Sequence, residues 1–240
     1  MDIEAQQMLP NSTLLKLATD EVRRGFVRKV YGLLSAQLLL TVLIATPFQF
    51  MNEVQLNSQR WLLSVSVLMT IAVVCAITCC KDMTRSYPTN YAILFTFTFF
   101  EAILVGYVSA AYTWQSVMMC AGLTTFIFLA LTVYAFKTST DFTGFGPMLY
   151  GALLSLVAWG ISICFLGALG VPIDWAVMLY DLIGVLVFVI YIVYDTQLII
   201  GGEHKAHKFT VDDYVFAALT LYLDIIQLFM RLLRLLGKKK

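Results

Sequence analysis

Seven long apolar runs dominate this chain of 240 residues and decide what it can fold into. Each is about 20 residues long, the length that an α-helix needs to cross the hydrocarbon core of a bilayer. Hydrophobic side chains make up 60% of the chain and charged ones only 13%, against about 25% charged in ordinary soluble domains. The runs do not alternate apolar and polar residues, as the strands of a membrane β-barrel do. The sequence therefore predicts an all-α polytopic membrane bundle of seven transmembrane helices, at Val30–Met51, Trp61–Cys80, Asn90–Tyr112, Ser116–Phe136, Gly146–Leu169, Trp175–Ile200 and Tyr214–Leu236.

Composition divides the chain into two parts. Residues 1–22 are polar and lack a strong helical pattern, so we expect them to form a flexible cytosolic head. Residues 23–240 are expected to form the transmembrane helical bundle, because the connections between the runs are too short to hold another domain. The absence of an internal sequence repeat argues against a transporter built from inverted repeats.

The basic residues are unevenly distributed between the two sides of the predicted bundle. Arg60 is the only basic residue in the connections on one side, whereas the head and the connections on the other side contain Lys16, Arg23, Arg24, Arg28, Lys29, Lys81, Arg85, Lys137, Lys205 and Lys208. By the positive-inside rule, the N-terminus is cytosolic. Seven crossings would nevertheless place Arg231, Arg234 and Lys238–Lys240 on the opposite side. Either the earlier helices decide the orientation, or the last run is re-entrant; the length of Tyr214–Met230 favours a crossing.

Four acidic residues lie within the apolar runs: Glu101, Asp181, Asp195 and Asp224. A charged side chain at the centre of a membrane helix costs about 2.5–3.5 kcal/mol, so such residues are functional candidates. Asp181 and Asp195 are 14 residues apart, which returns them to one face of the sixth helix, roughly 21 Å apart along its axis. The sixth and seventh helices are joined by a short connection and are expected to be antiparallel neighbours. Asp224 would then lie within reach of Asp195.

The pair Asp195 and Asp224 is the predicted proton and Ca²⁺ switch. Two carboxylates close together in a low dielectric cannot both ionise cheaply, so they are expected to share a proton. The protonated pair would hold the two helices together through hydrogen bonds. The deprotonated pair would repel itself or bind a hard cation, and Ca²⁺ suits such a site because it prefers oxygen ligands.

Two alternatives stay open at this point. Each aspartate could instead bond a nearby hydroxyl or backbone group, with Tyr191, Tyr194 and Tyr222 as the candidate partners. Glu101 could line the same polar interior as the pair, or be protonated and hydrogen-bonded in its own place.

Several segments resemble the Bax inhibitor (TMBIM) superfamily, and most closely its Lifeguard branch. They are "FVRKVYGLLSAQLLLT", "FFEAILVGY", "LTVYAFKTSTDFTGFG", "YIVYDTQLI" and "DDYVFAALTLYLDIIQLF", so the resemblance runs from about Arg23 to the C-terminus. "YDTQ" and "LYLDII" are weak signals alone and specific together. The resemblance implies that the seventh helix is central, and that the paired aspartates of the family correspond to Asp195 and Asp224. It also implicates Asp212, at the start of the seventh helix.

The resemblance further implies a pH-sensitive Ca²⁺ leak across intracellular membranes and suppression of cell death. The expected location is the Golgi apparatus or endoplasmic reticulum, with the plasma membrane as the second choice. The expected partners are Ca²⁺ as permeant ion, the lipid bilayer and membrane death-regulator proteins, with no nucleic acid, no bound cofactor and no enzymatic activity. In some bacterial relatives an arginine of the second helix pairs with the aspartates. Here Trp61–Cys80 contains no basic residue, and Arg60 lies at the wrong end.

Two other classes of function compete with the ion leak. Intramembrane aspartyl proteases also use two aspartates on adjacent helices, but they carry a Gly-x-Gly-Asp and a Pro-Ala-Leu motif. Leu-Tyr-Leu precedes Asp224 here, and Pro-Ala-Leu does not occur. A non-conducting scaffold that modulates other channels or death factors is the second competitor, and the sequence does not distinguish it from a channel.

Overall fold

The computed structural model describes residues 11–79, 86–201, 209–210 and 212–240, with their side chains from residue 21 onward except that of residue 78. Seven helices in this part of the chain are long and apolar enough to cross a membrane, which confirms the predicted all-α bundle. The elements are α2 (Asn11–Gln49), α3 (Glu53–Ser58), α4 (Arg60–Cys79), α5 (Thr89–Ala110), α6 (Trp114–Lys137), the 3₁₀ turn η2 (Thr143–Phe145), α7 (Gly146–Ala168), α8 (Asp174–Ile200) and α9 (Tyr214–Leu236).

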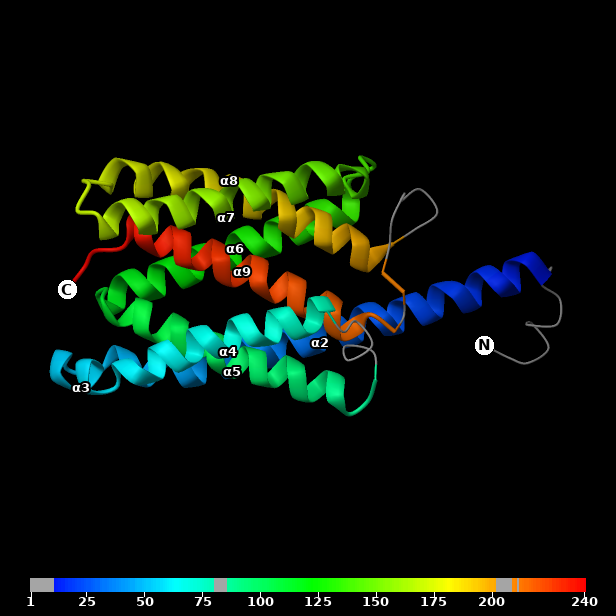
Figure 1. Cartoon of the computed structure of the whole chain (residues 1–240). Helices are drawn as coiled ribbons and strands as arrows, with labels where there is room; N and C mark the ends of the chain where they lie inside the picture. The colour runs from blue at the N-terminus through cyan, green and yellow to red at the C-terminus, as the bar shows by residue number, and fades with distance from the viewer. Residues whose placement is uncertain (1–10, 80–85, 202–208, 211) are drawn as a thin grey trace.

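The first helix begins earlier than the apolar run that predicts it. The helix α2 begins at Asn11, within the residues 1–22 that the sequence predicts to be a flexible cytosolic head; residues 1–10 lie outside the described part. Extending a helix that is already formed adds one hydrogen bond for each residue fixed, without a new nucleation step. The membrane segment therefore propagates its helix into the polar head, and the N-terminal part of α2 projects beyond the other helices (Figure 1).

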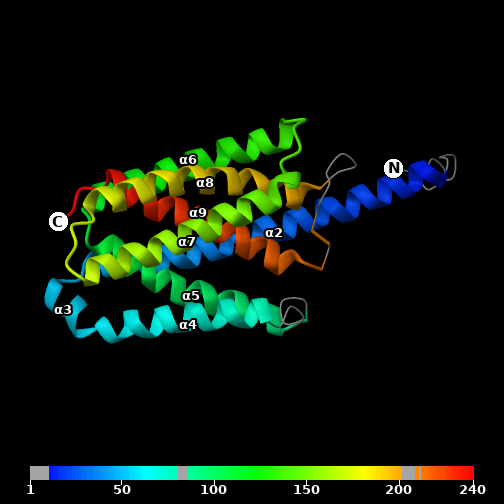
Figure 2. The same cartoon turned by 45° about the horizontal axis from the view of Figure 1, so that its top comes forward.

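The last helix lies at the centre of the bundle. It contacts α2, α5, α6 and α8, whereas α4 packs mainly on α5 and α7 on α8 (Figures 1 and 2). In the apolar stretch of α9 67% of the residues are buried, against 11–50% in the other six spans. The centre of the bundle is therefore a helix that carries Asp224, Arg231 and Arg234 within its length.

Different helix ends lie at the two ends of the bundle. The entry end contains the start of α9 and the last turns of α6 and α8; the tail end contains the last turn of α9 and the C-terminal residues (Figure 1). Lys137, at the end of α6, and the exposed Arg24, Arg28 and Lys29 of α2 lie toward the entry end of the bundle. Lys81, Arg85, Lys205 and Lys208 lie outside the described residues, so a cytosolic N-terminus stays a prediction.

The C-terminal residues pack back onto the bundle. After α9 ends, Thr113 N–H donates to Lys238 O (2.9 Å) and Lys240 N–H donates to Ala111 O (3.0 Å). The Lys240 ammonium donates to the backbone oxygen (2.9 Å) and side-chain oxygen (2.8 Å) of Gln49, at the end of α2. Because α9 is one continuous helix of 23 residues, it has the length to cross and shows no re-entrant turn.

Arg23 joins the first helix to the entry end of α8. Its guanidinium donates from Nε to Ile200 O (2.9 Å), from Nη2 to Leu198 O (2.6 Å) and from Nη1 to Phe209 O (2.6 Å). The last carbonyls of a helix have no partner within the helix and carry partial negative charge, so a cation there is favourable. Arg23 therefore caps α8 and fixes its entry end against α2.

We expect Arg23→Ala to lower the free energy of unfolding by about 2 kcal/mol, because three carbonyls lose a charged donor. For a chain of this size that corresponds to a fall in melting temperature of roughly 4–8 °C. Thermal unfolding in one detergent would measure the change, with the exposed neighbour Arg24→Ala as matched control. Equal melting temperatures for the two variants would contradict the capping role.

Candidate functional site

Asp195 and Asp224 meet at the contact between α8 and α9. Asp195 lies five residues before the end of α8, and Asp224 lies ten residues into α9. The helices are adjacent and sequential, so they run antiparallel and bring these two levels together. The two carboxyl groups are within hydrogen-bonding reach of each other, and Asp195 is also within reach of the Thr220 hydroxyl. Each aspartate is 5% exposed.

The described residues around the pair supply hydroxyls and no ion-paired cation. Tyr191 lies close enough to interact electrostatically with both aspartates, and Tyr194 with Asp195. Among the described residues, no lysine, arginine or histidine forms an ion pair with either carboxyl group. The Oδ2 atom of Asp224 is buried without a hydrogen-bond partner in the described part of the chain. A second negative charge on this pair would therefore be unbalanced by protein groups.

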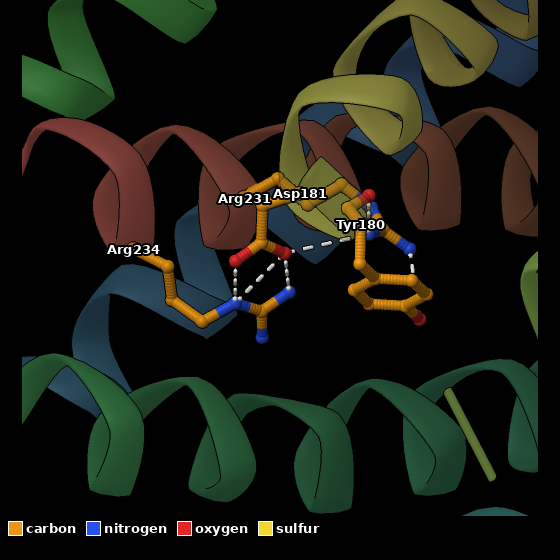
Figure 3. Close-up of polar contacts among 4 residues, drawn as sticks. All are labelled: Tyr180, Asp181, Arg231 and Arg234. Atoms are coloured by element: carbon orange, nitrogen blue, oxygen red, sulfur yellow. Dashed lines mark hydrogen bonds and ion pairs between the residues drawn. The ribbon is translucent and has the colours of Figure 1, made fainter. Parts of the chain in front are cut away.

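Asp181 lies in a very different environment at the other end of the same helix contact. Its Oδ1 and Oδ2 atoms accept from Arg234 Nε (3.0 and 2.9 Å), and Oδ1 accepts from Arg234 Nη2 (2.6 Å). Arg231 Nη1 approaches the same carboxylate at 3.4 Å. Figure 3 shows the Asp181 carboxylate pointing toward the guanidinium of Arg234, with Arg231 beside Tyr180. Asp181 is thus neutralised by arginines of α9 and does not join the pair.

Arg231 is enclosed almost completely, at 3% exposure. Its guanidinium lies over the ring of Tyr180, with Cζ 4.4 Å from the ring centroid, and donates to the Tyr180 hydroxyl at 3.2 Å. Gly184, one turn after Asp181 on α8, leaves the space that this group fills, because a Cβ atom at that position would clash with the guanidinium of Arg231. Gly184, Asp181 and Tyr180 of α8 thus together enclose and bind the side chain of Arg231 from α9.

Arg231 and Arg234 both lie inside α9, within the predicted run Tyr214–Leu236. Long arginine side chains are tolerated within a membrane helix when an acid of a neighbouring helix neutralises them. One signal in the sequence could have found the contact. With Asp195 opposite Asp224 in antiparallel helices, Asp181 falls level with residue 238, just past the end of α9 and four residues beyond Arg234.

Glu101 is buried on a different side of α9. It lies in α5, within electrostatic reach of Tyr222, whose hydroxyl hydrogen-bonds to Thr41 (2.8 Å). Tyr222 and Asp224 are two residues apart, about 200° around the helix, so they face nearly opposite directions. Glu101 therefore belongs to a polar contact among α2, α5 and α9, and the structure does not bring it to the aspartate pair. Tyr222 likewise bonds α2 and no aspartate.

Asp212 is exposed in the turn before α9. Ten helical residues, roughly 15 Å, separate the start of α9 from Asp224, so Asp212 does not contact the pair. Arg60 lies at the tail end and donates to Asn57 (3.1 Å), which leaves the pair without an arginine from α4.

We expect Asp181→Asn to destabilise the protein by about 3–5 kcal/mol, because it leaves buried guanidinium groups without their acid. Arg234→Gln should cost clearly less, because the Arg234 side chain is 32% exposed and its loss leaves Arg231 to neutralise Asp181. Thermal unfolding of both variants in the same detergent would test the order. An Asp181→Asn variant as stable as the unaltered chain would show that the ion pairs contribute nothing.

Comparison with known proteins agrees with this architecture. The sequence model of the Bax inhibitor family, described as "Inhibitor of apoptosis-promoting Bax1", matches residues 23–240. The chain is 34% identical over 224 residues to Protein LIFEGUARD 4 of Arabidopsis thaliana, covering 90% of this chain and 86% of the relative. It is 31% identical over 223 residues to Protein lifeguard 3 of Homo sapiens, covering 91% and 70%. To Protein lifeguard 3 of Mus musculus it is 28% identical over 221 residues, covering 91% and 71%.

Proposed function

Because the chain belongs to the Bax inhibitor family, we propose that it is a pH-sensitive Ca²⁺ leak channel of intracellular membranes that suppresses cell death. The gate is the pair Asp195 and Asp224. The observation that carries the proposal is the contrast between two acidic sites on one helix contact. Asp181 is neutralised by two arginines, whereas the pair has only hydroxyl neighbours among the described residues.

The protonated pair is the closed state of the proposed gate. One proton held between two carboxyl groups supplies a hydrogen bond across α8 and α9 and removes half of the negative charge. With both groups 5% exposed, leaving them both ionised would bury two like charges with little water to solvate them. At low pH the pair therefore keeps the two helices together and the path between them narrow.

Loss of the shared proton opens the gate. Two carboxylates in contact repel each other and require either water or a cation between them. Ca²⁺ is attracted because its preferred ligands are oxygen atoms, and carboxylate and hydroxyl oxygens gather here. Among the described residues no group of three acids, histidines or cysteines could hold a metal ion. An ion with so few protein ligands keeps part of its hydration shell. This suits permeation of Ca²⁺ through the protein better than stable binding of Ca²⁺ to it.

Two fixed contacts limit where α8 can move relative to its neighbours. Arg23 fixes its entry end to α2, and Asp181 fixes its tail-end half to α9. Asp195 lies about 21 Å from Asp181 along the helix and about 7 Å from the end that Arg23 caps. Opening is therefore a local separation of α8 and α9 at the pair, without separation of the whole helices.

The proposed location is the Golgi apparatus or endoplasmic reticulum, and the proposed partners for the cell-death role are membrane death-regulator proteins. The family description, "Inhibitor of apoptosis-promoting Bax1", supports this role. A leak that lowers the stored Ca²⁺ of an organelle would reduce the amount available for release during a death signal.

Proton-dependent Ca²⁺ flux is the deciding measurement. The purified chain is reconstituted into liposomes that contain a Ca²⁺-sensitive dye, and flux is followed from about pH 5 to pH 8. We expect flux to rise with pH, because higher pH removes the shared proton. Asp195→Asn and Asp224→Asn should each flatten this dependence, because an amide neither ionises nor shares a proton. Asp174→Asn, an exposed acid in the first turn of α8, is the matched control and should titrate like the unaltered chain.

Each competing function predicts a different result in the same preparation. A scaffold without transport gives no flux at any pH, and flux that both pair variants leave equally pH-dependent would place the switch elsewhere. Cleavage of a membrane substrate that Asp224→Ala abolishes would identify an aspartyl protease instead.

A further inference from the structure

A cavity of about 730 Å³, widely open to the surface, lies at the entry end, away from the aspartate pair. Its lining comes from three helices and from the two residues just before α5: Lys29, Tyr87, Pro88, Tyr91 and Tyr214. Ligand pockets commonly have volumes of about 300–1,000 Å³. The cavity is therefore large enough for a small organic group and larger than a single inorganic ion requires.

Lys29 supplies a positive charge at this cavity. Its ammonium lies 3.3 Å from the centroid of the Tyr214 ring, and within the described residues it forms no ion pair with an acid. Arg28 and Arg24, one and five residues before Lys29 on α2, are exposed as well, and the exposed Asp212 lies two residues before Tyr214. The ammonium at the lining itself favours an anionic occupant.

Tyr214 supplies a hydrogen-bond donor whose direction is restricted. Its hydroxyl oxygen accepts a hydrogen bond from Asn90 Nδ2 (2.8 Å), and Asn90 is 0% exposed. Asn90 is held in turn through its Oδ1 atom, which accepts from Tyr91 N–H at 2.8 Å. Because the hydroxyl oxygen already serves as acceptor, its own proton is available to a ligand. A buried side chain therefore fixes the position of the hydroxyl group of a tyrosine that lines the cavity.

The cavity lies at the first residues of two helices that are long enough to cross a membrane. Pro88 directly precedes α5, and Tyr214 is the first residue of α9. The rings of Tyr87 and Tyr91 (centroids 6.0 Å apart) and of Tyr91 and Tyr214 (6.1 Å) form an aromatic cluster. Tyrosines gather at the level of lipid headgroups, and the first turns of two helices add partial positive charge there.

We propose that this cavity binds the phosphorylated headgroup of an anionic membrane lipid, with Lys29 as the charged partner and the Tyr214 hydroxyl as a hydrogen-bond donor. A phosphate monoester carries about −1.5 to −2 charges and three strong acceptor oxygens, which match the ammonium and the phenolic O–H. The position at the end of two membrane helices favours a lipid over a soluble phosphate. The proposal stands independently of the Ca²⁺ leak.

The test uses the full chain in detergent, titrated with phosphatidylinositol 4-phosphate or phosphatidylcholine, with bound lipid counted by native mass spectrometry. We expect the phosphorylated lipid to bind at least about tenfold more tightly than phosphatidylcholine. Lys29→Ala should weaken its binding about tenfold or more, and Lys29→Arg should retain it, because the charge is kept. Tyr214→Phe should weaken binding severalfold. Lys137→Ala is the matched control: it removes an exposed lysine at the same end that does not line the cavity.

Three outcomes would overturn the proposal. Equal losses in Lys29→Ala and Lys137→Ala would show general attraction to a basic surface. Equal affinity of the unaltered chain for both lipids would remove the headgroup specificity. Displacement of the lipid by millimolar inorganic phosphate would indicate a site for a soluble anion. Circular dichroism and the elution volume of each variant establish that it is folded before the titration.

Discussion

The contact between α8 and α9 depends on how buried negative charge is neutralised. In surroundings with little water, an ionised carboxylate must be balanced by a cation or must take up a proton. This one contact contains one acid of the first kind and two without a cation among the described residues. Toward the tail end, Asp181 is balanced by Arg231 and Arg234; toward the entry end, Asp195 and Asp224 have no such cation among the described residues and lie within reach of each other. The proposed switch lies at the second site, because its neutrality would depend on a shared proton.

The rest of the bundle positions this contact. The helix α9 is held on its other face by the Tyr222 hydroxyl against Thr41 of α2, and the packing of Tyr222 on Phe97 of α5 adds to it (centroids 6.5 Å apart). Arg23 fixes the entry end of α8 against α2. With α9 enclosed and α8 held near both ends, the aspartate pair lies in a stretch between these two fixed contacts. In the proposed gate, a change of protonation at the pair would act on two helices whose other contacts stay in place.

Sequence reasoning found the parts of the molecule that leave a periodic or compositional signal. The seven spans follow from apolar length alone, and the meeting of Asp195 with Asp224 follows from antiparallel neighbours with a short connection. The helix from Asn11 was missed because propagation from a membrane segment overrides a polar composition. The Asp181 contact was missed because Arg231 and Arg234 are near the end of the last run, where basic residues usually mark a flank. The role of Arg23 was beyond prediction, since its partners are backbone carbonyls that no side-chain pattern reveals.

Gly184 has a consequence for how this region can vary. The guanidinium of Arg231 occupies the volume that a side chain at residue 184 would fill, and that same group helps to balance the charge of Asp181. A methyl group at position 184 would thus require the guanidinium of Arg231 to shift, which would disturb its contact with Asp181 one turn earlier. The effects of substitutions at positions 181, 184 and 231 are therefore expected to depend on one another, because the three residues share one contact between α8 and α9.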